Sequence, residues 1–300
     1  MIDCRLFLIS ALMCSLGTMA RKPADVFIYA GQSNADGRAF VSSLPDYLKG
    51  GRPYRFLNFA NVTTSSDGKF GKREFTNPKG RFAFCDVTNY WIEKALTRDF
   101  YAVKCAYGGT AIDTLATLPK RPVWCADSIW IARNNAHRGN IATGKSLTKS
   151  LAEGFADCVD VTLGRIEEGY DVKAIMWHQG ESDRKKSGHY YKNFKDMILY
   201  MRNAIYAVTG DEADKTLPFI FGTVSHRSKQ YSREVEEAQK RVASELPNVY
   251  CIDLSYAGLL DDQLHFDGQW TDYVGKLMYN KLVELKLVKG KALKVKRPAE

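Results

Sequence analysis

Short apolar segments alternate along the chain with longer amphipathic segments. The first apolar run, residues 26–30 (VFIYA), stops at Gly31, a pattern typical of a buried strand that leads into a tight turn. Further strands are predicted at residues 52–58, 100–106, 172–177 and 217–224, with a short strand at 248–254. Apolar residues at helical spacing predict helices at residues 82–96, 147–168, 190–208, 232–246 and 271–286. This alternation favours βαβ units and a parallel sheet covered by helices on both faces.

Three polar, glycine-bearing turns follow predicted strands directly. They are GQSN at residues 31–34, GGT at 108–110 and HQGESD at 178–183. Right-handed crossovers place every strand-to-helix turn at the same edge of a parallel sheet, where open α/β sheets bind ligands. We therefore expect the three turns to line one crevice. The simpler alternative is that Ser33 or Asn34 only caps the following helix.

Ser33 is a candidate nucleophile, which requires a base and a carboxylate that orients the base. Of the five histidines, His265 stands out because Asp262 lies three residues before it, in the last loop before the final predicted helix. One turn of chain brings that carboxylate to Nδ1–H and leaves Nε2 free to accept a proton. The other candidate base near the crevice, His178, ends an apolar run and is predicted to be partly buried.

Acyl transfer also needs hydrogen-bond donors aimed at the oxyanion that develops during the reaction. The backbone N–H groups of Ser33 and Gly109 are candidates, since glycine lets the main chain approach a substrate closely. The side-chain amide of Gln179 is a third candidate donor.

The four segments GQSN, GGT, HQGESD and DQLH (residues 262–265) resemble the conserved blocks of the SGNH-hydrolase superfamily. More narrowly, they resemble its sialate O-acetylesterase-like branch, which includes the acetylxylan esterases of carbohydrate esterase family six. The resemblance spans roughly residues 25–284. Gln32 stands where many members of the superfamily have Asp, and Gln179 where many have Asn, which favours the narrower branch.

This resemblance implies a flavodoxin-like, three-layer α/β/α sandwich around a central, mainly parallel five-stranded sheet. It also implies hydrolysis of O-acetyl esters on carbohydrate through an acetyl-enzyme intermediate, without a metal or organic cofactor. Carried over by position, Ser33 is the nucleophile, His265 the base and Asp262 its partner, while Gly109 and Gln179 match the oxyanion-hole positions. Four further residues are expected to support the site: Gln32, Asn34, Glu181 and Asp183. Glu181 competes with Asp262 as the residue that orients His265.

Aromatic residues near the Gly109 turn are candidates for contact with a sugar. These are Tyr107, Trp124 and Trp130, of which the last two lie in a long irregular stretch, residues 112–145. Long loops within compact domains are usually functional. Core packing is the alternative for each tryptophan, and Arg121 and Arg133 could bind an acidic sugar or be ordinary surface charge.

The ends of the chain differ from its centre. Residues 1–20 combine Arg5, an apolar run and small residues before position 21, which predicts a secretory signal peptide and a secreted or periplasmic protein. An esterase domain is then expected over residues 21–286 and a basic tail over 287–300. The lysines of this tail contribute to the net charge of +9. They indicate either contact with an acidic polymer or, more simply, a solvated and frayed end.

Five cysteines remain after the predicted signal peptide, without a CxxC pair, so one or two disulfides are compatible with export but zinc binding is not expected. The expected partner is an acetylated oligo- or polysaccharide, rather than nucleic acid or, beyond export, a membrane. Two alternatives stay open, a catalytically silent carbohydrate-binding protein and a glycan acetyltransferase. The glycan (xylan, sialic acid, pectin or another), the oligomeric state and the cysteine pairing also stay open.

Overall fold

The computed structural model describes residues 22–49, 59–61, 69–71, 73–77, 79–117, 121–134 and 150–299. The predicted signal peptide and the predicted strand at 52–58 lie outside these residues, as does His137. The described part holds a parallel sheet with helices on both faces, so the predicted α/β fold class is confirmed.

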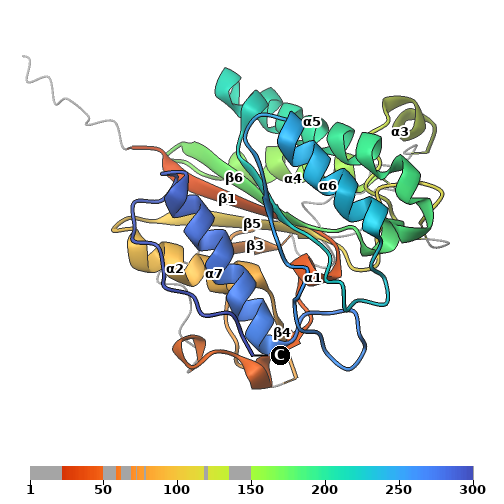
Figure 1. The fold of residues 1–300 in the computed structure, drawn as a ribbon. Coiled ribbons are helices and arrows are strands. Elements are labelled where there is room, and N and C mark those ends of the chain that lie inside the picture. The colour runs from red at the N-terminus through yellow and green to blue at the C-terminus, as the bar shows by residue number, and fades with distance from the viewer. Residues whose placement is uncertain are drawn as a thin grey trace, which may run out of the picture.

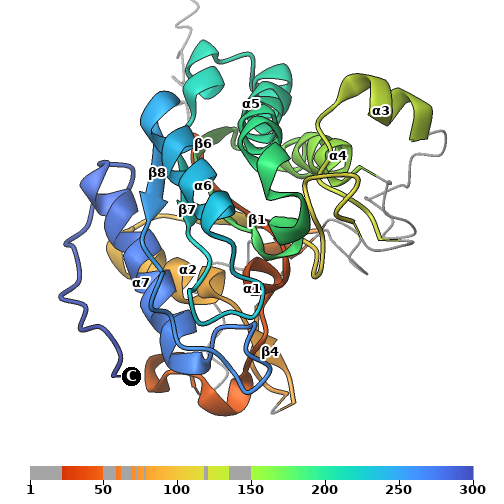
Figure 2. The same cartoon turned by 45° about the vertical axis from the view of Figure 1, so that its right-hand side comes forward.

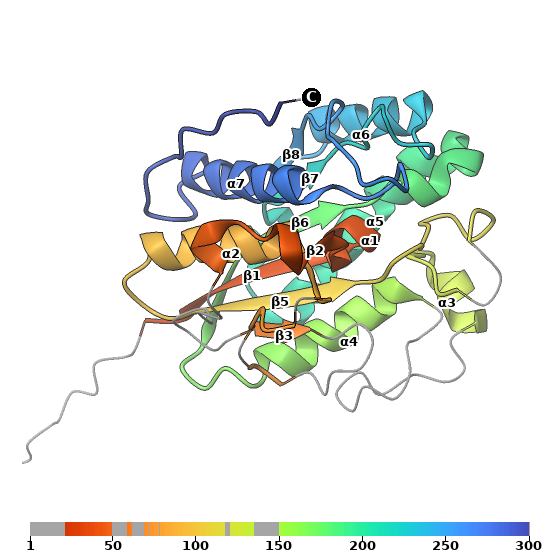
Figure 3. The same cartoon turned by 90° about the horizontal axis from the view of Figure 1, so that it is seen from below.

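The main sheet has the strand order β3-β5-β1-β6-β7-β8, and every pairing in it is parallel. Figure 3 shows the strands in this order from one edge to the other. Their bounds are Phe59–Asn61 (β3), Phe100–Ala106 (β5), Ala24–Gly31 (β1), Tyr170–His178 (β6), Phe219–Gly222 (β7) and Val249–Ile252 (β8). The described sheet thus has six strands where five were expected, because both short edge strands, β3 and β8, pair with their neighbours.

The sheet divides the core into two layers, with helices covering both of its faces (Figure 1). Val26 and Ile28 face one side of the sheet and pack with α4 (Leu151–Leu163), α5 (Tyr190–Thr209) and α6 (Arg233–Glu245). Phe27 and Tyr29 face the other side and pack with α2 (Phe84–Ala95) and α7 (Gly268–Glu284). A strand buried on both faces reads as a continuous apolar run, which is why β1 could be predicted.

Several smaller elements complete the fold. A two-stranded antiparallel ribbon pairs β2 (Ala39–Phe40) with β4 (Arg81–Phe82). The stretch expected to be irregular contains α3 (Ser128–Asn134), which stands beside α4 and away from the sheet (Figure 2). The remaining elements are the short α1 (Ser33–Asp36) and the 3₁₀ helices Val41–Ser43, Asp46–Leu48, Glu181–His189 and Glu212–Thr216. No helix of the described chain is long and apolar enough to cross a membrane.

The basic C-terminal segment is docked, and the expectation of a frayed tail is wrong for the described residues up to 299. Asn280 on α7 holds it with two hydrogen bonds, since its Nδ2 donates to Leu293 O at 3.0 Å and its Oδ1 accepts from Leu293 N at 2.7 Å. Val288 is buried in the core beneath α7. Figure 1 shows the segment running back along that helix. Apolar residues spaced between the lysines supply this contact.

The five described cysteines are free thiols, four of them buried. Two belong to facing elements: Cys105 on β5 and Cys158 on α4 have their Sγ atoms 2.7 Å apart.

Candidate functional site

The Ser33 turn is shaped by the close approach of β1 to β6. Gly31 ends β1 with φ of +128°, and a Cβ placed there would lie 2.2 Å from the carbonyl oxygen of His178. The Gln32 N–H donates to that same oxygen at 2.9 Å, so glycine is required at this turn. Ser33 then becomes the first residue of α1, with Gln32 at the N-cap position and without a side-chain cap bond. The simple helix-cap role therefore does not describe Ser33.

Asn34 joins the Ser33 turn to the segment that carries His265. Its Oδ1 accepts from the Phe266 N–H at 3.0 Å, and its Nδ2 donates to Leu264 O at 3.4 Å. These two contacts lie on either side of His265. The same Nδ2 donates to Glu181 Oε1 at 2.8 Å. Asn34 thus connects two of the turns that were expected to meet, at residues 31–34 and 178–183, with the segment that carries His265.

The Asp262–His265 loop has the local geometry predicted from the D-x-x-H spacing. Asp262 Oδ2 lies 2.6 Å from His265 Nδ1, and Asp262 Oδ1 accepts from the backbone N–H groups of Leu264 and His265 at 2.9 and 3.0 Å. Partial burial raises the pKa of Asp262, but the hydrogen bonds from His265 and Leu264 outweigh it and hold the pKa below its ordinary value. The carboxylate is ionised at neutral pH, and it favours the tautomer with Nδ1–H and an unprotonated Nε2.

Glu181 was the competing partner for His265, and the structure places it elsewhere. Its Oε1 contacts Asn34 and His178, the latter through Nε2 at 3.1 Å. Burial raises the pKa of Glu181. The His178 ring and the Asn34 amide lower it by more than burial raises it, so the pKa stays below the usual value. Within the described chain, Asp262 is therefore the carboxylate in contact with the His265 ring, and Glu181 supports it indirectly through Asn34.

The Gly108–Gly109 turn borders Ser33, as predicted. Tyr107 N–H donates to Gly31 O at 2.9 Å, which ties the end of β5 to the end of β1. A Cβ placed on Gly108 would lie 3.5 Å from Ser33 Cβ. Gly109 has φ of +72°, a left-handed conformation that favours glycine. The two turns thus lie side by side at the ends of β1 and β5.

The expected oxyanion role of Gln179 is contradicted by its contacts. Its Nε2 donates to Thr110 O at 3.2 Å and to Asp183 Oδ2 at 2.5 Å, which uses both amide hydrogens, and its side chain is fully buried. Its Oε1 accepts from Tyr190 Oη at 3.0 Å. Gln179 therefore braces the strand-end turn that begins at Gly108 instead of facing a substrate.

Asp183 supports the same turn from below. Its carboxylate accepts from the backbone N–H groups of Ile112 and Asp113, at distances from 2.8 to 3.2 Å. Burial raises the pKa of Asp183 to about 6, against the opposing effect of these hydrogen bonds. Gln32, the last expected support, is buried and accepts weakly from the Ser182 N–H at 3.4 Å.

The candidate sugar-binding aromatics separate into three environments. Trp124 is a core residue, since it is buried, packs edge-on against Trp177 and donates its indole N–H to Thr110 Oγ1 at 3.1 Å. Tyr107 is half-buried next to the glycine turn, with the Arg121 guanidinium 5.8 Å from its ring centre. Trp130, on α3, lines a separate pocket that does not include His265.

His265 and Asp262 line a pocket of about 610 Å³. Its wall also contains Arg38 and the β2–β4 ribbon, where the Arg81 guanidinium lies 3.3 Å above the ring centre of Phe40. Sequence analysis missed these three residues. Among the described residues, neither Ser33 Oγ nor His265 Nε2 makes a hydrogen bond, so the structure brings their segments together without joining these two atoms. Catalytic hydrogen bonds are often long before substrate binds.

Among the described residues, no group of three or more His, Cys, Asp or Glu side chains is placed to hold a metal ion.

Comparison with solved structures shows the fold shared by this chain. A structure titled NanS superposes with a TM-score of 0.63 at 12% identity, covering 90% of this chain and 99% of that one. A protein from Arabidopsis thaliana gives 0.58 at 22% identity, covering 88% and 99%. A carbohydrate acetylesterase from Xanthomonas citri, XAC1771, gives 0.58 at 17% identity, covering 86% of this chain and 55% of that one. None of the curated protein sequences compared matches the chain.

A family model provides the more specific comparison. The model described as "Carbohydrate esterase, sialic acid-specific acetylesterase" matches residues 88–284, well over half of the chain. The matched range contains the Gly109 turn, the HQGESD segment and the Asp262–His265 loop. The chain therefore belongs to this carbohydrate esterase family.

Proposed function

We propose that this chain is a serine esterase that removes O-acetyl groups from carbohydrate through an acetyl-enzyme intermediate. Membership of the carbohydrate esterase family supports carbohydrate deacetylation in general. The observation that carries the more specific proposal is the 2.6 Å contact between Asp262 and His265, in a loop that Asn34 fastens to the Ser33 turn.

In the first half of the reaction, His265 Nε2 accepts the Ser33 proton as Oγ attacks the acetyl carbonyl carbon. The carbonyl oxygen becomes an oxyanion, which accepts hydrogen bonds from the backbone N–H groups of Ser33 and Gly109. The bond to the sugar oxygen then breaks, and His265 returns the proton to that oxygen. Acetyl-Ser33 and a free sugar hydroxyl result.

In the second half, His265 takes a proton from water as the water oxygen attacks the acetyl carbonyl. The Ser33 Oγ bond breaks, Ser33 regains a proton from His265, and acetate leaves. Asp262 stabilises the imidazolium in both halves, because its lowered pKa keeps the carboxylate charged. Gln179 and Asp183 contribute only by holding the Gly109 turn in place.

The proposed substrate is an acetylated oligo- or polysaccharide, with O-acetylated sialic acid and acetylated xylan as the first candidates. The family description supports the former, and the narrower resemblance of the four sequence blocks supports both. We also propose export to the cell exterior or periplasm, on the basis of residues 1–20.

A panel of acetylated polysaccharides and O-acetyl sialosides, assayed for acetate release with Ser33→Ala as the control, tests this proposal. We expect release from at least one member of the panel and its loss in Ser33→Ala. Glycan binding without acetate release from any substrate would favour the silent binding protein. Acetylated product on an added acceptor glycan, at the expense of free acetate, would favour an acetyltransferase.

A further inference from the structure

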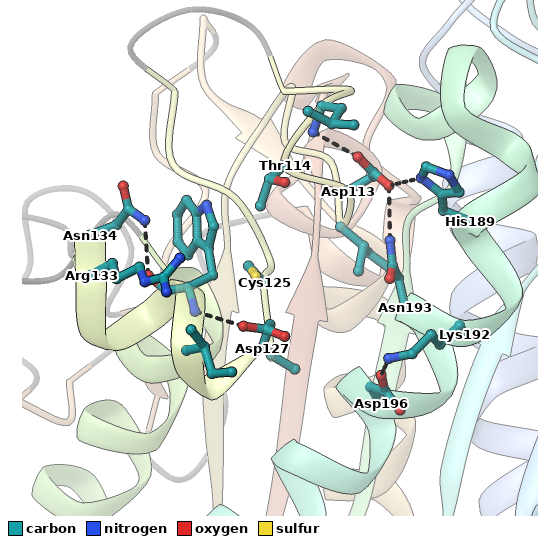
Figure 4. A pocket seen from close by; sticks show the side chains of 15 residues that line it. Asp113, Thr114, Cys125, Asp127, Arg133, Asn134, His189, Lys192, Asn193 and Asp196 are labelled. Atoms are coloured by element: carbon teal, nitrogen blue, oxygen red, sulfur yellow. Dashed lines mark hydrogen bonds and ion pairs between the residues drawn. The ribbon is translucent and has the colours of Figure 1, made fainter.

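A second pocket, of about 490 Å³, lies between α3 and the beginning of α5 (Figure 4). It shares no lining residue with the pocket that contains His265. The proposed reaction does not use it, yet Trp130, one of the aromatic residues expected to contact sugar, belongs to its wall.

The polar groups of this second pocket are held in fixed positions. Asp113 has a side chain only 6% exposed, and its Oδ2 lies 2.7 Å from His189 Nδ1 and accepts from Asn193 Nδ2 at 3.0 Å. Its Oδ1 accepts from the Leu115 N–H at 2.6 Å. Figure 4 shows both His189 and Asn193 directed toward the Asp113 carboxylate. With Nδ1–H committed to Asp113, the exposed His189 ring offers Nε2 to a ligand, and Asn193 offers Oδ1.

The same pocket exposes apolar surface. Leu115 and Ile129 are 68% and 61% exposed, and both are among the few large apolar side chains that the described chain leaves open to solvent. Half-buried Trp130 lines the same pocket. Apolar surface gathered around convergent polar groups is typical of a ligand site and unusual for an unused surface.

Charge indicates the class of ligand. The acidic lining residues are countered by basic ones, since Lys192 pairs with Asp196 at 2.5 Å and Arg133 lies on the same helix as Trp130. Asp127 is engaged in capping α3, where its Oδ1 accepts from the Trp130 N–H at 2.6 Å. With neither sign in large excess, the pocket suits a neutral ligand that has many hydroxyl groups and flat C–H faces. An uncharged oligosaccharide has this chemistry.

One short segment connects the second pocket to the glycine turn that lies beside Ser33. Asp113 follows Gly109 by four residues, a distance that an extended chain spans in at most about 14 Å. Asp183 fixes this segment from the sheet side by accepting from the Asp113 N–H at 2.8 Å. A glycan bound in the pocket is therefore within reach of the proposed nucleophile.

We propose that the second pocket is a distal glycan site that holds an uncharged part of the sugar chain while the acetyl ester lies at Ser33. This inference rests on the proposed function for its substrate. It assigns Trp130 to binding of the chain at a distance from the reacting ester.

Direct binding separates this proposal from the proposed reaction. Unacetylated xylohexaose, cellohexaose and a galactohexaose are titrated calorimetrically into Ser33→Ala protein, and into the same protein carrying Trp130→Ala or Trp130→Phe. We expect at least one hexaose to bind, Trp130→Ala to weaken it about tenfold or more, and Trp130→Phe to retain most of the affinity. Tyr206→Ala, which removes a half-buried aromatic ring at the far end of α5, is the matched control and should bind as the parent does.

A kinetic comparison completes the test. In the enzyme with Ser33 intact, Trp130→Ala should raise KM for the acetylated form of the bound hexaose and leave kcat/KM for p-nitrophenyl acetate unchanged. Failure of all three hexaoses to bind would overturn the distal site, as would equal binding to Trp130→Ala. If an anionic hexagalacturonide bound more strongly than any of the three neutral hexaoses, and Arg133→Gln abolished this binding, the assignment of an uncharged ligand would be overturned. Loss of acetate release from every ester, with hexaose binding retained, would instead overturn the proposed function.

Discussion

Replacing Asn34 by alanine removes the side chain that fastens the His265 loop to the Ser33 turn. The Phe266 N–H, buried in this contact, is left without its acceptor, which typically costs about 1–3 kcal/mol. The buried Glu181 carboxylate loses its 2.8 Å donor, and a hydrogen bond to a charged group is worth about 1.5–3 kcal/mol. We therefore expect the free energy of unfolding to fall by about 2.5–6 kcal/mol.

We also expect kcat to fall, independently of the loss in stability. With both contacts flanking His265 released, the imidazole is no longer held against the Ser33 turn, and a displacement near 1 Å costs about a hundredfold in rate. Urea unfolding measures the first effect, and kcat on p-nitrophenyl acetate, at a temperature where the variant is folded, measures the second. A folded Asn34→Ala protein with an unchanged free energy of unfolding and a kcat within threefold of the parent's would refute this reasoning.

Asn34→Asp is the informative companion variant. It keeps an acceptor for the Phe266 N–H but places a second carboxyl against Glu181, and two adjacent carboxylates raise the pKa of one of them. A group whose pKa is higher in the folded state than in the unfolded state stabilises the protein at pH values below its unfolded-state pKa. This stabilisation is lost as pH rises through its folded-state pKa. Asn34→Asp should therefore lose stability relative to the parent as pH rises from 4 to 7. A difference that does not change with pH would contradict the Asn34–Glu181 contact.

Three further predictions follow from the same structure. Asp262→Asn should lower kcat by about 10³- to 10⁴-fold through the wrong His265 tautomer, while Asp261→Asn, its exposed neighbour in the same pocket, should leave kcat nearly unchanged; equal effects would contradict the assignment. The pKa of Asp183 is raised from 3.8 to about 6, so its contribution to stability is present below pH 4 and declines, by about 3 kcal/mol, as pH rises through 6. Urea melts from pH 4 to 7 should show a shallower decline in Asp183→Asn, and an identical slope would argue against this. In protein recovered from an oxidising compartment, Cys105 and Cys158 should form a disulfide worth about 4 kcal/mol, because the loop it closes spans 53 residues. Thiol titration in denaturant should then find two fewer thiols than after reduction, and equal counts would exclude the bond.

Local patterns were sufficient to predict the elements and turns that depend on near neighbours in sequence. The apolar run of β1 ends at Gly31 because a Cβ at that position would lie only 2.2 Å from His178 O, and this close packing sets the position of Ser33. The Asp262–His265 contact closes within one turn of chain, so its spacing alone predicted it.

Contacts between distant segments were beyond such patterns. Gln179 turned away from the expected oxyanion position because its amide finds Thr110, 69 residues earlier in the chain. Phe40 and Arg81 meet through a ribbon of two-residue strands, too short to show periodicity. The C-terminal segment looked like a charged tail because a lysine-rich composition conceals the few apolar residues that dock it, such as Val288.

The central claim is that Ser33 carries the acetyl group during turnover. Rapid acid quenching of the enzyme with excess p-nitrophenyl acetate, followed by proteolysis and mass spectrometry, locates any acetyl adduct. We predict one acetyl group on Ser33 in the wild-type enzyme. In Ser33→Ala, we predict neither an acetyl adduct nor acetate release. Acetylation at another side chain that turns over at the rate of acetate release, or undiminished release by Ser33→Ala, would contradict it.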